Sequence, residues 1–372
     1  MKSTMPKSFR FHFAGGGTAG HLFPALAIAN EIKQRFPEAE ITFWGTRRGI
    51  EAKILPTTNF TLEFIPVRGF QRRLSLRNLF FPFALVASFV KVFRSLLVKR
   101  PKAVIGTGGY VSGPVAFTAW LLRIPVFIQE QNSYPGVTTR LLARIAKRVY
   151  VSFEVSKEYF RNREKLRVTG NPVRADICRA SRNEAFRKFG FSPEQPVLFV
   201  FGGSQGARRI NQLMADILPV LLEKTSLQIL WSTGPSDYDE IRGKTAADTR
   251  VKLFDFIKDM PDAYAVSSLI VSRSGATTLA ELAACGLPSV LIPYPYATGG
   301  HQVFNARSFE SEGAAVCLLE KNLMPESLAQ VIQELLGNPE KLQAMAKAAK
   351  KLAKPDAAKV ITDDIFAELK IK

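Results

Sequence analysis

The stretch "FRFHFAGGGTAGHLFPALAIANEI", residues 9–32, decides the fold class of this chain. Its first residues are apolar and rich in phenylalanine, as in a buried strand, and its last residues are alanine-rich and amphipathic, as in a helix. Gly15, Gly17 and Gly20 match the G-x-G-x-x-G pattern, in which glycines let the backbone approach a phosphate at a helix start. Because this spacing alone is a weak signal, it predicts an anion-binding turn and leaves the ligand open.

The same order of strand, glycine turn and helix returns in "PVLFVFGGSQGARRINQLMADIL", which begins at residue 196. Other apolar runs, such as "ITFWG" at 41 and "AVIG" at 103, alternate with helical segments. This alternation predicts parallel sheets with helices on both faces. We therefore expect an α/β protein with two doubly wound, Rossmann-like domains that face each other across a cleft, with ligands at the carboxyl ends of the strands.

The length and the net charge of this chain limit the classes of protein to which it can belong. The chain has 372 residues, more than one hydrophobic core usually holds. Its 51 Lys and Arg against 32 Asp and Glu leave a charge of +19, which attracts phosphate-bearing ligands or anionic membranes. Nucleic acid would also suit this charge, but we expect none to bind because no recognised reader motif is present. Cys178, Cys285 and Cys317 lack C-x-x-C spacing, which indicates a reducing compartment and no zinc site.

Residues 76–100 form the most apolar segment, but Pro82, Lys91 and Arg94 interrupt it before the ~20 apolar residues that a membrane span requires. Basic residues beside phenylalanines are typical of a surface that lies on anionic lipid. A core helix with a solvated charged face fits the pattern as well, although residues 68–78 read as a loop, where burial is not the default. The expected membrane contacts are Phe80, Phe81, Phe83, Arg72, Arg73 and Arg77. No signal peptide is expected, because the first residues enter a glycine turn before an apolar region forms.

Two other enzyme classes share these motifs. Two arginines in "FWGTRRGIE", which begins at residue 43, would suit the phosphate of NADP and an oxidoreductase. Ser204 of "GGSQG" matches the nucleophile elbow of hydrolases, and Asp255 or Asp262 with His301 would complete a triad. The glycines around Ser204 equally describe a turn whose backbone N–H groups face an anion, and the basic, twin-domain chain favours that interpretation.

The stretch "SRSGATTLAELAACGLPSVLIPYPYATGGHQVFNA", residues 272–306, carries the strongest chemical signal. A turn of small residues from Ser274 to Thr278 opens a helix, whose backbone donors suit a diphosphate. Glu281 can accept two ribose hydroxyls, or it can simply stabilise the helix dipole. Gln302 follows the loop "YATGGH" and can reach sugar hydroxyls. The stretch therefore predicts a site for a nucleoside diphosphate linked to a sugar.

Seven segments, in order along residues 15–306, resemble the MurG family of UDP-N-acetylglucosamine transferases of peptidoglycan synthesis. They are "GGGTAGHLFPALAIA", "GTGGYVSGP", "QEQNSYPG", "GNPVR", "GGSQGARRIN", "RSGATTLAELAACGLPSVLIPYP" and "HQVFNA". The resemblance implies the GT-B glycosyltransferase fold and transfer of N-acetylglucosamine (GlcNAc) from UDP-GlcNAc to the 4-hydroxyl of undecaprenyl-diphospho-MurNAc-pentapeptide (lipid I), giving β-1,4-linked lipid II. A diacylglycerol galactosyltransferase or a UDP-GlcNAc epimerase would keep the nucleotide site and change the acceptor side.

The resemblance also assigns residues. The UDP-GlcNAc contacts that it implies are Thr18, Ala19, Gly20, Asn132, Arg174, Ser204, Ile257, Ala276, Thr277, Thr278, Leu279, Ala280, Glu281 and Gln302. Asn132 and Gln302 would meet the sugar, the backbone of Ile257 the uracil, and the helix start the diphosphate and ribose. Many members carry acidic or amide residues where this chain has Thr298, Gly299 and Gly300, which leaves the contacts of that loop with the sugar open.

Inversion at the anomeric carbon calls for a base on the acceptor side and charge stabilisation on the UDP side. His21, whose reference pKa is ~6.5, is the candidate base, unless it only caps the helix start. Glu281 is the second candidate catalytic residue, and Ser204 and Arg273 would help to stabilise UDP. No Asp-x-Asp run marks a metal site, so we expect a reaction without metal or other cofactor.

Gly170 and Pro172 mark a domain junction. We expect an acceptor and membrane-association domain over 1–170, a donor domain over 171–354, and a helix over 355–372. The resemblance implies that this helix returns to the first domain. The resemblance implies a peripheral protein on the cytoplasmic face of the inner membrane, active in cell-wall synthesis, cell shape and division. Its implied partners are UDP-GlcNAc, lipid I, the anionic membrane and other cell-wall and division proteins.

Overall fold

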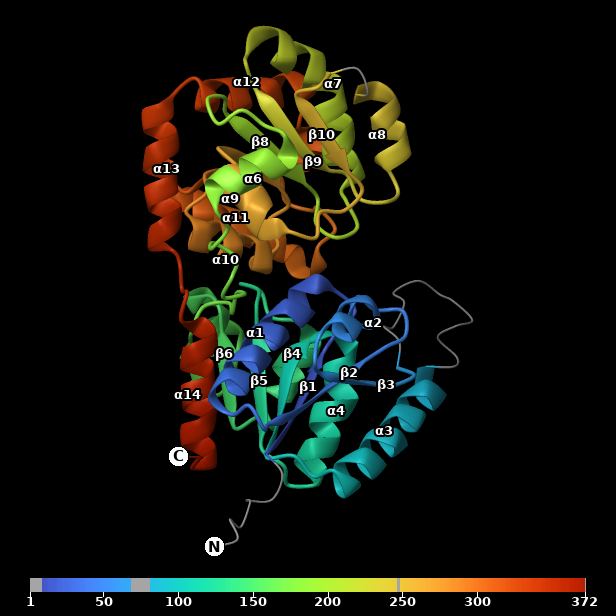
Figure 1. Ribbon diagram of the computed structural model, residues 1–372. Helices are drawn as coiled ribbons and strands as arrows, with labels where there is room; N and C mark the ends of the chain where they lie inside the picture. Colours follow the sequence, from blue (N-terminus) through green and yellow to red (C-terminus); the bar gives the residue numbers. More distant parts are fainter. Residues whose placement is uncertain (1–8, 68–80, 246–247, 372) are drawn as a thin grey trace, which may run out of the picture. The chain divides into compact units, whose positions relative to one another are not determined.

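The computed structural model describes residues 9–67, 81–245 and 248–371. The chain forms two compact units: unit 1 is Met1–Arg174 with Pro355–Lys372, and unit 2 is Ala175–Lys354. Each unit is built on one sheet with helices on both faces (Figure 1). The expected pair of doubly wound, Rossmann-like sheets is therefore confirmed.

Unit 1 contains a parallel sheet in the order β3-β2-β1-β4-β5-β6-β7. Its strands are β1 (Arg10–Gly15), β2 (Glu40–Gly45), β3 (Thr61–Phe64), β4 (Ala103–Gly108), β5 (Val126–Glu130), β6 (Arg148–Val151) and β7 (Leu166–Val168). Its helices are α1 (Ala19–Arg35), α2 (Glu51–Ile54), η1 (Leu55–Thr57), α3 (Phe81–Val98), α4 (Gly109–Leu121), α5 (Val137–Leu142), η3 (Glu154–Tyr159) and α14 (Ala357–Leu369). The strand order reverses direction between β1 and β4, where ligands bind in sheets of this kind.

The two faces of this sheet carry different helices. Because successive side chains of a strand point to opposite faces, Phe11 and Phe13 of β1 pack with α1 and α14, whereas Ala14 packs with α4. Helices α3, α4 and α5 share the second face, since Val92, Val115 and Leu142 belong to one buried cluster.

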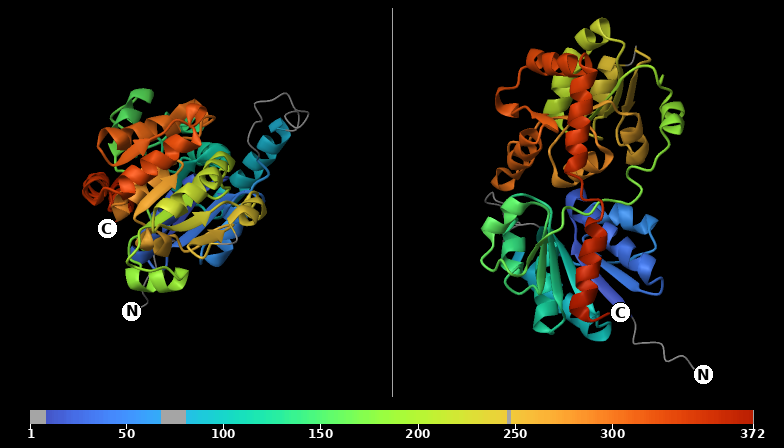
Figure 2. Two further views of the ribbon diagram at one scale, coloured as in Figure 1. Left: turned by 90° about the horizontal axis from the view of Figure 1, so that it is seen from above. Right: turned by 90° about the vertical axis from the view of Figure 1, so that its left-hand side faces the viewer.

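Helix α14 completes the core of unit 1 although it lies far away in the sequence. Figures 1 and 2 show it along β6 and α1. Ile361 and Ile365 are fully buried in the cluster that contains Phe11. Tyr150 of β6 donates a hydrogen bond to Asp364 at 2.8 Å. Burial and the nearby Asp364 carboxylate raise the pKa of the Tyr150 phenol, so this tyrosine stays protonated as the donor.

Unit 2 contains a second parallel sheet in the order β10-β9-β8-β11-β12-β13. Its strands are β8 (Val197–Phe201), β9 (Gln228–Ser232), β10 (Val251–Phe254), β11 (Leu269–Ser272), β12 (Ser289–Leu291) and β13 (Ala315–Cys317). Its helices are α6 (Arg182–Phe189), α7 (Arg208–Lys224), α8 (Tyr238–Thr245), α9 (Met260–Val266), α10 (Ala276–Cys285), η4 (Thr298–Gly300), α11 (His301–Ser311), η5 (Glu320–Asn322), α12 (Pro325–Leu336) and α13 (Pro339–Lys351). Leu198 and Val200 pack with α7 and α12, whereas the Phe199 and Phe201 rings meet Tyr264 of α9.

Candidate functional site

The glycine turn of unit 1 joins β1 to α1. Gly17 has a φ of +86°, which a residue with a side chain rarely adopts. Thr18 is the N-cap of α1, so Ala19 and Gly20 stand in the first turn of the helix. The predicted residues Thr18, Ala19 and Gly20 thus lie at a helix N-terminus, where backbone N–H groups favour an anion.

A buried carboxylate that the sequence analysis did not single out supports this turn. Glu51 is completely buried, and it accepts hydrogen bonds from the Gly17 N–H at 2.8 Å and from the Thr46 N–H at 2.7 Å. A Cβ atom on Gly16, Gly45 or Gly49 would come within 2.6 Å of its side chain. Those glycines therefore make room for Glu51, which links the β1–α1 turn to the end of β2.

His21 stands over a second glycine turn of unit 1, at the start of α4. Its Nδ1 lies 3.0 Å from the Thr18 hydroxyl. Gly108 and Gly109 have φ values of +106° and +74°, and a Cβ on Gly108 would lie 2.7 Å from the imidazole. The "GGGTAGH" and "GTGGY" segments are therefore adjacent, with the candidate base between them.

Hydrogen bonds connect further predicted segments of unit 1. The Thr107 hydroxyl donates to the His21 carbonyl oxygen at 2.7 Å, and the Gln131 side-chain amide donates to the Thr107 carbonyl oxygen at 2.7 Å. The Gln131 amide also donates to Gln129, whose own amide donates to Asn171 at 3.1 Å. This buried chain of polar groups brings "GTGG", "QEQN" and "GNPVR" together around the first glycine turn.

Asn132 and Arg174 occupy ordered positions in unit 1. Glu130 accepts hydrogen bonds from the backbone and side-chain N–H groups of Asn132, at 3.0 Å and 3.1 Å. The Arg174 guanidinium stacks over the Phe23 ring at 5.3 Å, and its Nε is buried without a hydrogen-bond partner. The roles that the resemblance assigns to these two residues stay predictions.

The glycine turn of unit 2 joins β8 to α7 and holds Ser204. Gly203 and Gly206 have φ values of +91° and +76°, and the Gly206 N–H donates to the Gly203 carbonyl oxygen at 2.9 Å, which closes a tight turn around Ser204. A Cβ on Gly206 would lie 2.0 Å from the Thr233 carbonyl oxygen. Only glycine fits this approach to the end of β9.

The start of α10 is the second candidate anion site of unit 2. Gly275 is the N-cap, so the predicted residues Ala276 to Ala280 form the first turns of the helix. The Ser274 hydroxyl donates to the Gln302 carbonyl oxygen at 2.7 Å, and the Gln302 side chain accepts from the Tyr294 N–H at 2.9 Å. Gln302 is thereby fixed beside the turn. Ile257 is buried in the loop that follows β10.

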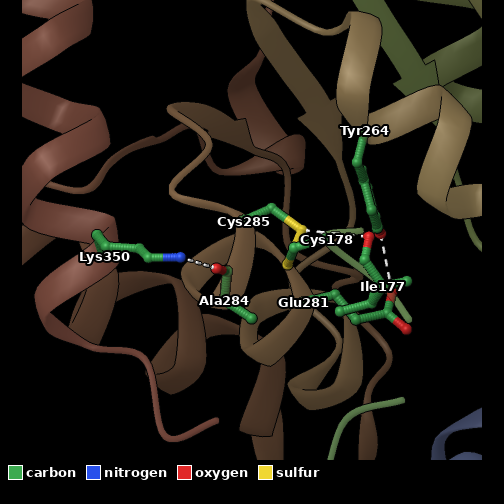
Figure 3. The surroundings of a disulfide bond; sticks show 7 residues. All are labelled: Ile177, Cys178, Tyr264, Glu281, Ala284, Cys285 and Lys350. Carbon is green, nitrogen blue, oxygen red and sulfur yellow. Dashed lines mark hydrogen bonds between the residues drawn. A yellow bond between two sulfur atoms is a disulfide. The ribbon is translucent and has the colours of Figure 1, made fainter. Parts of the chain in front are cut away.

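Glu281 lies one turn further along α10 and is nearly buried. The Tyr264 hydroxyl donates to its Oε2 at 2.8 Å, and the two side chains meet in Figure 3. Tyr264 thus orients the carboxylate, a role that no motif indicated. Arg273 forms an ion pair with Glu320 and donates to the Ile292 carbonyl oxygen at 3.0 Å, and its expected role in stabilising UDP stays a prediction.

The cysteines of unit 2 differ from what their spacing indicated. Cys178 and Cys285 form a disulfide across 107 residues of sequence (Figure 3), whereas a reducing compartment disfavours such bonds. The bond attaches the start of unit 2 to the last residue of α10. Cys317 is a buried free thiol, and burial raises its pKa.

The predicted membrane contacts are only partly described. Phe83 is 73% exposed on α3, whereas Arg72, Arg73, Arg77, Phe80 and the side chain of Phe81 lie outside the described residues. Within the described ranges, every helix falls short of the length or apolarity needed to cross a bilayer. In the same ranges, no group of three or more His, Cys, Asp or Glu side chains is arranged to hold a metal ion. Independence from metal stays a prediction.

Sequence comparison identifies both units. Residues 11–151 match the glycosyltransferase family 28 N-terminal domain, and residues 197–361 match the glycosyltransferase family 28 C-terminal domain. The chain is 41% identical over 361 residues, 96% of its length and 98% of the relative's, to the UDP-N-acetylglucosamine--N-acetylmuramyl-(pentapeptide) pyrophosphoryl-undecaprenol N-acetylglucosamine transferase of Acetivibrio thermocellus. The relative of the same name in Clostridioides difficile is 41% identical over 95% of this chain and 87% of its own.

Solved structures agree with this assignment. The crystal structure of Acinetobacter baumannii MurG matches 96% of this chain and 99% of its own with a TM-score of 0.75 at 29% identity. A UDP-GlcNAc 2-epimerase from Neisseria meningitidis, bound to UDP-GlcNAc, shares the fold with a TM-score of 0.70 at 14% identity, over 97% of this chain and 100% of its own. These findings support a glycosyltransferase and argue against the oxidoreductase and hydrolase hypotheses. The chain belongs to glycosyltransferase family 28 and, within it, to the family of UDP-N-acetylglucosamine--N-acetylmuramyl-(pentapeptide) pyrophosphoryl-undecaprenol N-acetylglucosamine transferases.

Proposed function

We propose that this enzyme transfers GlcNAc from UDP-GlcNAc to the 4-hydroxyl of lipid I, with inversion at the anomeric carbon, and so forms lipid II. The observation that carries the proposal is 41% identity, over nearly the whole chain, to relatives named for this reaction. The glycine turns of both units stand at the carboxyl ends of parallel strands, where sheets of this type bind nucleotides and sugars.

The donor half of the reaction belongs to unit 2 in this proposal. The UDP diphosphate gains negative charge as the sugar leaves, and the backbone N–H groups at the start of α10 stabilise that charge without reorganising. Glu281 accepts hydrogen bonds from the ribose hydroxyls. The Tyr264 hydroxyl donates to one of its carboxylate oxygens at 2.8 Å and so fixes the plane of the carboxylate. Gln302 binds the sugar hydroxyls from a position set by the Tyr294 backbone.

The acceptor half belongs to unit 1. His21 removes the proton from the 4-hydroxyl as that oxygen attacks the anomeric carbon, and UDP departs on the opposite side. The Thr18 hydroxyl at 3.0 Å from Nδ1 orients the imidazole, so that its other nitrogen is the one that takes the proton. Positioning the ring over Gly108 and Gly109 keeps it against the backbone of a second turn.

We further propose that unit 1 rests on an anionic membrane through the outer sides of α3 and α4. Phe93 and Val90 of α3 and Trp120 of α4 are exposed, and Lys91 and Arg94 stand among them. Exposed apolar side chains interleaved with basic ones suit the interface of an anionic bilayer, and a lipid-linked acceptor lies in the same plane.

Transfer of radiolabelled GlcNAc from UDP-GlcNAc to a lipid I analogue in detergent tests the reaction. Label in the extracted lipid is expected, and label confined to UDP-GlcNAc or to a water-soluble sugar would reject the proposal and favour an epimerase. His21→Gln is expected to lower kcat by roughly 10²- to 10⁴-fold, because general base catalysis is lost. Glu281→Gln is expected to act mainly on the KM for UDP-GlcNAc, with Glu312→Gln, exposed on the same unit, as the matched control.

A further inference from the structure

A cavity of about 480 Å³ in unit 2 is lined by both cysteines of the disulfide, Cys178 and Cys285. It lies between the segment that precedes α6, the end of α10 and the first turns of α13, and its size is typical of a pocket for a small molecule. Cys178 is exposed, so the disulfide can be reached from solution. Among the residues that line the cavity, all of which the structure describes, Arg182 is the only charged one, and its charge favours entry of an anion.

The backbone around the two cysteines suits the pair of thiols as well as the disulfide. Their Cα atoms are 5.3 Å apart, a usual separation for a disulfide. The Cys285 Sγ also lies 3.5 Å from the Ile177 carbonyl oxygen (Figure 3), which can accept a hydrogen bond from the S–H group once the disulfide is reduced. Reduction therefore leaves the Cys285 thiol with an acceptor, and the surrounding fold does not have to open.

The setting of the disulfide favours reversible chemistry over a permanent bond. The sequence indicates a reducing compartment, where the disulfides that form are usually transient or redox-sensing. Cys317 does not compete in this chemistry, because it is a buried thiol whose pKa is raised by burial. Thiol chemistry in this chain is therefore confined to Cys178 and Cys285.

The pair of cysteines is connected to the candidate donor site through α10. Glu281 precedes Cys285 by four residues, so the two side chains lie on the same side of the helix. Tyr264, which donates to Glu281 at 2.8 Å, also lines the cavity, and Figure 3 shows this hydrogen bond close to the disulfide. The disulfide thus anchors the end of the helix whose start carries the predicted diphosphate contacts.

We propose that Cys178 and Cys285 form a reversible exchange site for a low-molecular-weight thiol, and that the state of this pair sets the affinity of unit 2 for UDP-GlcNAc. The second part rests on the proposed function, because it concerns the predicted donor contacts. Reduction releases residues 175–181 from the end of α10 and loosens the support of Glu281. UDP is therefore bound less tightly by the dithiol than by the disulfide.

The exchange reaction proceeds in two steps. The thiolate of a small thiol attacks the exposed Cys178 Sγ, which forms a mixed disulfide and releases the Cys285 thiolate to take up a proton. A second small thiol attacks the sulfur of the first, which frees Cys178 as a thiol and yields the disulfide of the small molecule. The protein gains two electrons and two protons, and the two small thiols lose them. In the reverse direction, the disulfide of the small molecule is the oxidant.

The test uses the full-length protein, equilibrated in glutathione buffers that differ in the ratio of thiol to disulfide. Cysteines are alkylated after acid quenching and unfolding, and mass spectrometry counts them. The oxidised protein should show Cys317 alone as a free thiol, and the reduced protein should show Cys178, Cys285 and Cys317. Titration calorimetry with UDP then gives the dissociation constant of each form, which should be roughly two- to tenfold higher for the reduced form.

Two variants separate the exchange site from a general effect of the buffer. Cys178→Ser changes an exposed position and leaves the core intact, so it should bind UDP like the reduced wild type in every buffer. Cys317→Ala removes the cysteine outside the cavity and should keep the response of the wild type. In Cys285→Ser, a mixed disulfide with glutathione should accumulate at Cys178.

The thiol count and the binding of UDP can fail separately. A thiol count that is the same in the most oxidising and the most reducing buffer would overturn the exchange site. Equal dissociation constants of the two forms for UDP would overturn its connection to the donor site. If the thiol count responds but neither form binds UDP, the exchange site stands, whereas the proposed function is contradicted together with that connection.

Discussion

The Glu51 carboxylate determines the shape of the first glycine turn, because it accepts hydrogen bonds from Gly17 and from Thr46. Glu51→Gln places an N–H₂ group against one of these N–H donors. We expect a loss of roughly 1.5 to 3 kcal/mol in the free energy of unfolding of unit 1, as for other hydrogen bonds to charged groups, and a lower transfer rate. Urea unfolding and the transfer assay measure both. Glu38→Gln, at an exposed position, is the control. Wild-type stability in Glu51→Gln would mean that the turn does not depend on the carboxylate.

His12 makes the stability of unit 1 depend on pH. Burial, followed by the charges of Lys99 and Arg10, lowers its pKa from 6.5 to about 4, and the Trp44 indole N–H donates to its Nδ1 at 3.1 Å. In the unfolded chain His12 is protonated below about pH 6.5, whereas in the folded chain it is protonated only below about pH 4. Between these two pH values the unfolded chain binds more protons, so the free energy of unfolding decreases as the pH falls. Between pH 7 and pH 4.5 the expected loss is roughly 2 to 3 kcal/mol.

Urea titrations at these two pH values, followed for the wild type and for His12→Gln, measure the effect. The variant should lose much less stability than the wild type on acidification, because glutamine does not titrate. Parallel losses in both proteins would show that other groups cause the acid sensitivity.

Single residues also show which parts of the candidate site a sequence can predict and which it cannot. The predicted positions Thr18 and Ser204 lie at glycine turns, and Glu281 lies in the second turn of α10, because local spacing defines such positions. Glu51 and Tyr264 were missed, since each acts on a residue that is at least 17 positions away in the sequence. Only the packed fold reveals these partners. The expected role of Arg273 at UDP stays a prediction, and a sequence does not show that Glu320 pairs with its guanidinium.

Among the elements, strands within continuous apolar runs were predictable, whereas β3 and β7 were not. Strands β1, β4 and β8 are buried along their whole length or nearly so, which gives continuous apolar runs. Strand β3 is only half-buried and β7 has three residues, so neither shows a run long enough to stand out. The helical character of residues 357–369 was visible, whereas the contacts of α14 with Phe36 and Tyr150 depend on the tertiary fold.

Helix α14 offers a direct test of how elements stabilise unit 1. Ile365 is completely buried against the sheet, whereas Val360 on the same helix is 46% exposed. Ile365→Ala should destabilise unit 1 by roughly 2 to 5 kcal/mol, through lost burial and the cavity left behind. Val360→Ala is the control and should change stability by less than about 0.5 kcal/mol. Similar unfolding curves for both variants would show that α14 adds little to the core.

At the scale of the whole molecule, two separate cores predict two unfolding transitions. Calorimetry should resolve them, because multidomain proteins depart from a single cooperative transition. UDP at about 100 times its Kd should raise one transition by about 2.7 kcal/mol of stability, namely that of unit 2. Ile365→Ala should lower the other. If a single transition responds to both changes, the two units unfold together.

Helix α14 also has a consequence for the order in which the protein is made. Unit 1 is interrupted by the 180 residues of unit 2, from 175 to 354, before the chain supplies α14. At a typical rate of translation, the ribosome needs roughly 10 to 40 s to add them. During this delay the nascent sheet of unit 1 exposes Phe11 and Phe36, the apolar residues that α14 later covers. Unit 2, whose residues are continuous in sequence, can fold before unit 1 is complete. Until α14 has emerged, the growing chain exposes an apolar surface that molecular chaperones recognise.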